Sequence, residues 1–254
     1  MGRVIAIANQ KGGVGKTTTA VNLSASLAAA GQRVLLIDGD PQGNSTSGLG
    51  VEKRDDRPTL YEVLMQKCTL ADAYRQTKID DLLLVPANID LAGAEFEMVS
   101  VMAREKRLAL ALASERSRFD FVLIDSPPSL SLLTINALAA ADTVLIPIQC
   151  EYYALEGLAQ LLNTVHMVQT NINPTLDIEG VLLTMFDGRT NLSIQVVEEV
   201  KKYFQQKVFR SIIPRNVRLS EAPSYGLPVR LYDGKSRGAE VYEELAREVL
   251  SRGA

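Results

Sequence analysis

Short apolar runs alternate with amphipathic segments along most of the chain. Most runs are apolar at every position rather than at every second one, which is typical of strands covered on both faces. We predict strands at residues 4–8, 34–37, 82–85, 121–124, 143–147, 178–183 and 208–213. Apolar residues at helical spacing predict helices at residues 16–30, 59–65, 104–115, 132–140, 154–170, 192–204 and 240–251.

This alternation of strands and helices predicts an α/β fold, a doubly wound and mostly parallel sheet with helices on both faces. Right-handed crossovers bring the carboxyl ends of the strands to one edge, where such folds bind ligands. The sequence shows no internal repeat, and its polar stretch at residues 52–58 is too short to separate domains. Residues 1–254 are therefore expected to form a single domain.

A glycine-rich segment, QKGGVGKTT at residues 10–18, lies between the first apolar run and the first helix. Its glycines let the backbone approach an anion closely, and the following helix start adds a positive dipole end. Lys16 then reaches the β- and γ-phosphates of a nucleotide, and the Thr17 hydroxyl ligates Mg²⁺. A flexible turn with two solvated lysines is the alternative, but it leaves the Gly-Lys-Thr triplet unexplained. Gln10 stands where the usual phosphate loop has its first glycine, and Lys11 is an additional lysine.

Aspartates follow two of the other apolar runs. Asp38 and Asp40 come after the second run, and Asp125 ends the run at 121–124. Asp125 is positioned to orient Mg²⁺, often through water. Asp38 and Asp40 are two residues apart, so we expect them to point to the same side, where one holds the attacking water or completes the magnesium shell. An ordinary Asp-Pro turn and a helix cap are the alternatives.

Composition narrows the class of protein. The chain has 254 residues, 46% of them hydrophobic, and a net charge of −3, so the whole molecule is not an obvious nucleic-acid binder. Cys68 and Cys150 form no CxxC pair, which suits a reducing cytosol. Neither a signal peptide nor an apolar run long enough to span a membrane is recognisable. We therefore expect a cytoplasmic protein.

Together, these motifs resemble those of the deviant Walker-A ATPases, and within them the ParA/Soj chromosome-partitioning family. KGGVGKTT, DGDPQGN and the later DSPP carry the first resemblance. CEYYALEG at 150–157, IPRNVRLSEAPSYG at 213–226 and SRGAEVY at 236–242 carry the second. The similarity runs from residue 2 to about residue 250, with Gly39 as a small departure where the family often has an apolar residue.

The resemblance implies an ATPase that uses ATP and Mg²⁺ and works as an ATP-dependent homodimer. It makes Lys11 a catalytic residue that touches the partner subunit's nucleotide, much as an arginine finger does. It makes Asp40 the residue that positions the hydrolytic water near the metal, and Asp125 a second residue near magnesium. Pro214 and Asn216 are expected to hold adenine. Lys16 and its neighbours in the loop are expected to bind the phosphates. These neighbours are Gly12, Gly13, Val14, Gly15, Thr17 and Thr18.

The resemblance also implies non-specific binding to double-stranded DNA, in agreement with the charge distribution. Residues 189–237 hold ten basic residues against four acidic ones, a net charge of +6, although the whole chain carries −3. Such a patch attracts phosphates without reading bases. The expected contacts are Arg189, Arg218, Lys201 and Lys202, with a solvated face as the alternative. A ParB-like centromere-binding protein is the implied partner, and it would stimulate slow hydrolysis, release the DNA and drive chromosome or plasmid segregation on the nucleoid.

Three alternatives share this scaffold. A MinD-like membrane-cycling ATPase needs a basic amphipathic C-terminal helix, but the polar face at 240–251 is largely Glu, so we expect that helix to pack on the core and no membrane to be bound. An electron carrier of the nitrogenase-reductase type would bridge an iron–sulfur cluster with two cysteines, yet no cysteine lies near Asp125. A small-molecule synthetase would need a substrate pocket that the sequence does not locate.

Overall fold

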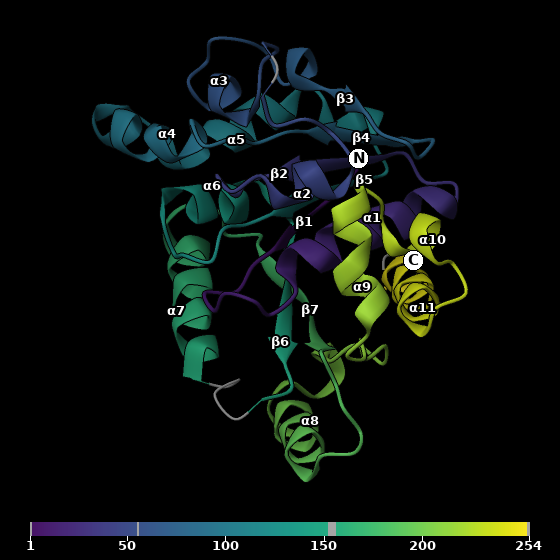
Figure 1. The fold of residues 1–254 in the computed structure, drawn as a ribbon. Coiled ribbons are helices and arrows are strands. Elements are labelled where there is room, and N and C mark those ends of the chain that lie inside the picture. Colours follow the sequence, from purple (N-terminus) through teal and green to yellow (C-terminus); the bar gives the residue numbers. More distant parts are fainter. Residues whose placement is uncertain (1, 55, 152–155, 253–254) are drawn as a thin grey trace.

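A single seven-stranded sheet organises the computed structural model, which describes residues 2–54, 56–151 and 156–252 (Figure 1). The strand order is β3-β4-β2-β5-β1-β6-β7, and all neighbours run parallel except β3 and β4. The predicted doubly wound α/β fold is thus confirmed. The strands are β1 (Arg3–Ile7), β2 (Val34–Asp38), β3 (Arg75–Gln76), β4 (Leu82–Val85), β5 (Phe121–Asp125), β6 (Thr143–Gln149) and β7 (Asp177–Thr184).

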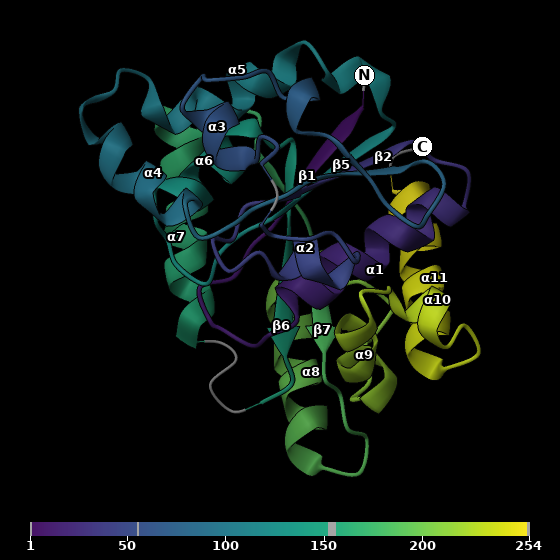
Figure 2. The same ribbon diagram turned by 45° about the horizontal axis from the view of Figure 1, so that its top comes forward.

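Helices cover both faces of this sheet (Figures 1 and 2). In β1, Val4 and Ala6 join one buried apolar cluster, whereas Ile5 and Ile7 join the other. Both faces of the strand are dry, which explains why its sequence is apolar throughout. The helices are α1 (Lys16–Ala29), α2 (Asn44–Gly48), α3 (Leu60–Leu64), α4 (Leu91–Glu97), α5 (Arg107–Ala113), α6 (Leu132–Ala140), α7 (Glu156–Asn171), α8 (Asn191–Phe204), α9 (Val217–Glu221), α10 (Val229–Tyr232) and α11 (Arg237–Ser251).

The strand predicted at residues 208–213 is wrong. Val208 makes one isolated bridge with Val181, but the backbone N–H groups of Arg210 and Ser211 donate to the Glu248 carboxylate in α11 instead of to a strand. The N–H groups of Phe209 and Ile213 still donate to the Val181 and Leu183 carbonyls of β7, but the N–H of Ser211 between them donates to Glu248, so the ladder beside β7 is interrupted.

Other boundaries differ for local reasons. The helix predicted at 104–115 divides into a 3₁₀ turn, Arg104–Lys106, and α5. Helix α11 begins at Arg237, earlier than predicted, because the Ser236 side chain accepts from the N–H of Ala239 and caps it. Helix α7 starts at Glu156, and the first two residues of the helix predicted at 154–170 lie outside the described residues. The short elements β3, α2, α4, α9 and α10 were not predicted. The single-domain prediction stays a prediction.

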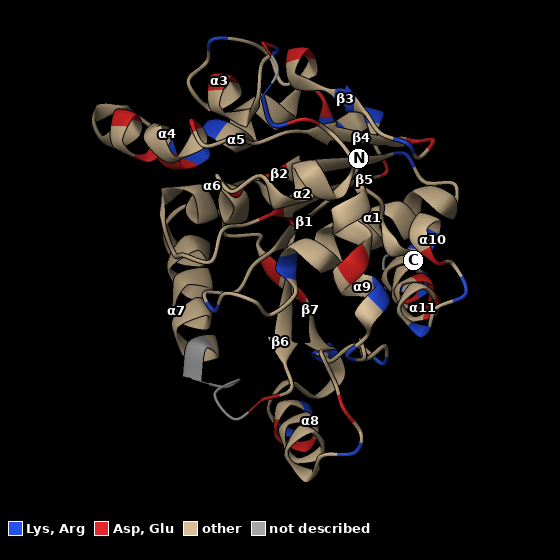
Figure 3. Ribbon diagram, viewed as in Figure 1, with Lys and Arg blue, Asp and Glu red and all other residues tan. Residues whose placement is uncertain are grey.

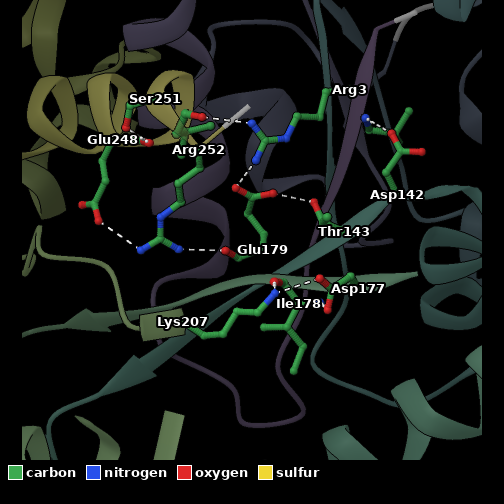
Figure 4. A network of polar contacts seen from close by, with 12 residues as sticks. Arg3, Asp142, Thr143, Asp177, Ile178, Glu179, Lys207, Glu248, Ser251 and Arg252 are labelled. Atoms are coloured by element: carbon green, nitrogen blue, oxygen red, sulfur yellow. Dashed lines mark hydrogen bonds and ion pairs between the residues drawn. The ribbon is translucent and has the colours of Figure 1, made fainter. Parts of the chain in front are cut away.

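A polar network fixes α11 to the edge of the sheet that lies opposite the glycine-rich loop (Figure 4). The Arg252 guanidinium donates to the Glu179 carbonyl at 2.8 Å and pairs with Glu248 at 3.1 Å. The Glu179 carboxylate in turn pairs with Arg3 and accepts from the Thr143 hydroxyl at 2.7 Å. These bonds connect the end of α11 with β1, β6 and β7. Helix α11 also packs beside α1.

Candidate nucleotide site

The glycine-rich loop joins β1 to α1 at the carboxyl edge of the sheet. Gly13 and Gly15 have φ values of 75° and 89°, in the left-handed region that side chains disfavour. The loop is attached to β7, because the Thr184 hydroxyl donates to the Val14 carbonyl at 2.8 Å. It is attached to β6 by Asn9, which donates to the Pro147 carbonyl at 2.7 Å. Hydrogen bonds to β6 and β7 therefore hold this tightly curved backbone in place.

This loop forms one wall of a cavity of about 400 Å³. The predicted residues Gly12, Gly13, Gly15, Lys16, Thr17, Thr18 and Asp40 all line it, together with Gln42, Asn44, Pro128 and Met185. A helix N-terminus at such a cavity favours anions, because the first N–H groups of the helix lack partners. The cavity therefore has the lining that a phosphate chain requires.

Lys16 places its ammonium group inside this region. Only 6% of the residue is exposed, and its Nζ donates to the Lys11 carbonyl at 3.0 Å. Burial lowers the pKa of Lys16, and the carboxylates of Asp125 and Asp40 oppose that effect. A desolvated cation beside an anion cavity provides strong electrostatic attraction for phosphate.

Asp125 is buried at the end of β5 with one carboxylate oxygen unsatisfied. Its Oδ2 accepts from the Ser45 hydroxyl at 2.8 Å, whereas Oδ1 has no partner within the part of the chain that the structure describes. Burial raises the pKa of Asp125, and the nearby hydroxyls of Ser45 and Thr17 oppose that rise. A dry acceptor without a donor is costly unless a cation or its water completes it. Asp125 and the Thr17 hydroxyl therefore suit a hydrated magnesium ion.

The two aspartates after β2 have different surroundings. Asp38 is fully buried, and its Oδ2 accepts from both the N–H and the hydroxyl of Thr46 at 2.7 Å. Its Oδ1 accepts from the Asp40 N–H at 3.2 Å, so Asp38 holds the turn together. Asp40 lines the cavity instead, and the N–H of Gln42 donates to its Oδ1. The expectation that both carboxylates point to the same side is wrong, because Thr46 draws Asp38 into the core.

A second pocket of about 460 Å³ adjoins the phosphate cavity and shares Gly15, Thr18 and Met185 with it. Pro214 and Asn216 line this pocket, as predicted for an adenine site, beside the buried ring of Tyr242. The Asn216 side chain also caps α9 by accepting from the Arg218 N–H at 2.9 Å. The remaining lining residues are Thr184, Ile213, Arg215, Leu219, Ser220 and Pro223.

Lys11 is separated from the other loop residues. It is not among the described residues that line the phosphate cavity. Its Nζ lies 4.0 Å from a carboxylate oxygen of Glu151, which also pairs with Arg215 at 3.4 Å. The Lys11 ammonium therefore has a counter-ion outside the cavity, at the entrance of the loop.

The basic residues of the C-terminal part are less segregated in space than along the chain (Figure 3). Arg189 pairs with Asp187 at 2.6 Å, and Arg218 pairs with Glu221 at 2.8 Å. Lys201 and Lys202, in the last turn of α8, are exposed and have no acidic partner among the described residues. Acidic partners from other segments thus offset much of the +6 charge counted over residues 189–237. The other paired cations of this segment are Lys207, Arg215, Arg230 and Arg237.

Comparison with known proteins identifies the family. A family model described as an AAA domain matches residues 2–178. The sporulation initiation inhibitor protein Soj of Bacillus subtilis is 61% identical over 253 residues, with 100% of each chain covered. The chain belongs to the ParA/Soj family of chromosome-partitioning ATPases. The predicted family and the ATPase class are thereby confirmed.

Solved structures share the fold of this chain. A cobyrinic acid a,c-diamide synthase from Mycobacterium smegmatis, with bound ATP analogue and magnesium, is 41% identical with a TM-score of 0.87, covering 98% of this chain and 95% of that one. The cell division ATPase MinD of Pyrococcus furiosus is 29% identical with a TM-score of 0.81, and each chain is covered completely. Proteins with different functions therefore share this fold, so the function of this chain has to be argued from the residues of its site.

Several contacts near the site were not predicted from the sequence. The hydroxyls of Ser45, Thr46 and Thr184 bond to Asp125, Ala87 and Val14, at least 41 residues away in the chain. Glu151 belongs to the motif at 150–157, of which residues 152–155 lie outside the described residues. Helix α11 packs on the core as predicted: Val241, Tyr242, Leu245 and Val249 are at most 1% exposed, and Leu250 is partly buried against the same cluster.

The electron-carrier and membrane alternatives gain no support from the described residues. Cys150 is buried and Cys68 lies in a different part of the fold, and no group of His, Cys, Asp or Glu there is arranged to hold a metal ion. Burial raises the pKa of the Cys150 thiol to about 11, which suits a packing role. None of the described helices is long and apolar enough to cross a membrane.

Proposed function

We propose that this chain is an ATP-switched DNA-partitioning ATPase. ATP and Mg²⁺ drive formation of an ATP-sandwich homodimer that binds double-stranded DNA without reading its sequence. Slow hydrolysis, stimulated by a ParB-like centromere-binding protein, then releases the DNA, so that repeated cycles on the nucleoid segregate a chromosome or plasmid. The observation that carries this proposal is the contrast between the two loop lysines: Lys16 lines the phosphate cavity, whereas Lys11 pairs with Glu151 outside it.

Within one subunit, the two adjoining pockets match the two ends of ATP. Pro214, Asn216 and Tyr242 surround the base pocket, and the loop with Lys16 holds the phosphates. Thr17 and Asp125 would hold Mg²⁺, which neutralises charge on the β- and γ-phosphates when bound. Asp40 lines the cavity with a carboxylate oxygen not taken up by Gln42, so it can accept a hydrogen bond from the attacking water.

Completion of the site requires a second copy. A phosphoryl group in transfer spreads negative charge over its equatorial oxygens, and an additional cation stabilises that charge. Lys11 is 35% exposed at its side chain and paired only loosely, at 4.0 Å, so it is free to reach a nucleotide held by another subunit. ATP hydrolysis would then depend on dimerisation.

DNA binding would follow from the same dimerisation. Lys201 and Lys202 have no acidic partner among the described residues, and Arg189, whose side chain is 88% exposed, can exchange Asp187 for a phosphate. One patch of this size binds DNA weakly, and two patches joined in a dimer bind with avidity. This arrangement makes ATP a switch for DNA binding.

A MinD-like membrane role is the alternative that shares the fold. Its amphipathic helix would have to insert an apolar face into the lipid. In α11 that face packs on the core, and the exposed face carries Glu240 and Glu244, which pair with Arg237. No feature of the described residues favours membrane binding over DNA binding.

The decisive experiment compares DNA binding by wild type and Arg189→Glu with ATP, ADP or no nucleotide, at two salt concentrations. We expect ATP-dependent binding by the wild type, a loss of at least about tenfold in the variant, and a steep decrease with salt. Arg118→Glu, which changes a partly exposed, paired arginine near β5, is the matched control. Equal binding in all three nucleotide states would refute the switch.

A further inference from the structure

The turn that follows β2 carries Asp40, the residue proposed to position the attacking water. The Asp40 carbonyl accepts from the N–H of Gly43 at 2.8 Å, and its Oδ1 accepts from the N–H of Gln42 at 2.9 Å. Asp40, Gln42 and Asn44 all line the phosphate cavity. A displacement of this turn would therefore move the Asp40 carboxylate relative to a bound phosphate chain.

Lys53 reaches this turn from a segment further along the chain, eleven residues after Gln42. Its Nζ donates to the Gln42 carbonyl at 2.6 Å. Its Cδ and Cε lie 3.1 Å from the position that a Cβ on Gly43 would take, and the Ala87 carbonyl oxygen lies 2.6 Å from the same position. Gly43 has a φ of 61°, so both the backbone and this close packing require a glycine. Lys53 thus contacts the turn at two adjacent residues, with its ammonium group and with its methylene groups.

The segment that carries Lys53 is itself held in place. The N–H of Val51 donates to the Thr46 carbonyl at 3.1 Å. Gly50 lies against the backbone of Gly226, because a Cβ on Gly50 would come within 2.8 Å of the Gly226 carbonyl oxygen. Helix α2 joins the turn to this segment and lies beside α1 (Figures 1 and 2). Lys53 therefore extends to the turn from an anchored backbone.

The turn is held at its two ends by different kinds of contact. At its beginning, the Asp38 Oδ1 accepts from the Asp40 N–H. Near its end, the Lys53 ammonium group donates to the Gln42 carbonyl, and a charged donor forms a stronger bond than a neutral one. Asp38 is fully buried, so its substitution would disturb the core, whereas Lys53 is partly exposed. The contact from Lys53 can therefore be removed by itself.

We propose that Lys53 is a positioning residue for ATP hydrolysis, which acts by holding the Asp40 turn and not by touching the nucleotide. Lys53 is not among the described residues that line the phosphate cavity, whereas Gln42, which it binds, is one of them. This inference rests on the proposed function, which assigns the attacking water to Asp40. A reacting group displaced by about 1 Å can lower a rate by about 100-fold. Because Asp38 still holds the other end of the turn, we expect a smaller loss of about tenfold when the Lys53 donor is removed.

Lys53→Met tests the ammonium group, because methionine keeps an apolar stem against Gly43 but cannot donate. The kcat for ATP hydrolysis, measured where ultracentrifugation shows the ATP-bound dimer, should fall about tenfold, while KM for Mg²⁺–ATP and the Tm stay unchanged. Lys53→Arg retains a charged donor and should recover most of the rate. Lys78→Met is the matched control, since the Lys78 Cε lies 3.7 Å from the position of a Cβ on Gly50, and Lys78 makes no bond to the turn among the described residues.

The outcomes separate this inference from the proposed function. If Lys53→Met hydrolyses ATP like the wild type while Asp40→Ala does not, the inference alone is overturned. If KM rises and kcat is unchanged, Lys53 attracts the nucleotide by its charge, and the inference is also overturned. A decrease in kcat that Lys53→Arg does not reverse, or that accompanies a lower Tm, contradicts it as well. If Asp40→Ala hydrolyses ATP normally, the role assigned to Asp40 falls and the inference falls with it.

Discussion

The side chain of Lys16 and the backbone of Lys11 are joined by a 3.0 Å hydrogen bond from the Lys16 Nζ to the Lys11 carbonyl oxygen. The bond leaves two of the three ammonium donors of Lys16 for phosphate. It also fixes the backbone at the loop entrance, while the Lys11 side chain extends to Glu151. Lys16 therefore contributes its ammonium group to the cavity of its own subunit, whereas the Lys11 side chain can reach a second subunit.

Substitution of the two lysines should separate nucleotide binding from dimerisation. We expect Lys16→Ala to weaken binding of Mg²⁺–ATP at least about 100-fold, because a buried charged hydrogen bond to phosphate is lost. Lys11→Ala should bind nucleotide within about threefold of wild type but lose ATP-driven dimerisation, hydrolysis or both. Isothermal titration calorimetry and ultracentrifugation measure the two properties independently. A Lys11→Ala variant that dimerises and hydrolyses normally would exclude a role for Lys11 in the partner's site.

Asp40 should be required for hydrolysis but not for binding. Asp40→Ala removes the carboxylate that lines the cavity, so the attacking water loses its acceptor. We expect ATP-dependent dimers to persist while turnover falls at least about 100-fold, a loss within the range of positioned acid–base groups. Asp80→Asn, in the loop before β4, removes the same charge far from the site and serves as the control. Normal turnover of Asp40→Ala would mean that another group positions the water.

The sequence predicted what depends on neighbours in the chain, and missed what depends on residues far apart. Glycine spacing located the phosphate cavity, and apolar periodicity gave the central strands. The hydroxyls of Ser45 and Thr184 bond to residues 80 and 170 positions away, and no local pattern reveals such pairs. The strand predicted at 208–213 failed for the same reason, since Glu248, 37 residues away, takes the N–H of Ser211 and interrupts the bonds to β7.

Charge counting along the chain had a similar limit. Residues 189–237 are basic as a segment, but Asp187 and Glu243 come from outside it and pair with Arg189 and Arg230. The packing of α11 against the sheet brings several of these acids to the basic surface. Which basic residues lack an acidic partner within the described ranges, as Lys201 and Lys202 do, is visible only in three dimensions.

Thr46 should contribute strongly to stability, because it connects the β2 turn with the core. Its hydroxyl donates to the buried Asp38 carboxylate and accepts from the Ala87 N–H at 3.0 Å. Thr46→Val keeps the side-chain shape but leaves both buried partners short of a bond. We expect a loss of about 2–4 kcal/mol in the free energy of unfolding, measured by urea denaturation without nucleotide. Thr46→Ser, which retains the hydroxyl, should lose clearly less, and equal losses would show that the methyl group matters more than the bonds.

Glu151 should restrain Lys11 before dimerisation, since its carboxylate is the counter-ion of that ammonium group. Pairs as exposed as this one contribute at most about 1 kcal/mol, so the restraint is weak enough to be exchanged when a partner's phosphate arrives. We expect Glu151→Gln to strengthen ATP-driven dimerisation by about two- to fivefold for each subunit at low salt, and the gain should shrink as salt screens the wild-type pair. Nucleotide affinity of the monomer should not change, and Asp80→Asn again controls for net charge. Dimerisation that weakens in Glu151→Gln at low salt would instead assign the carboxylate a contact within the dimer.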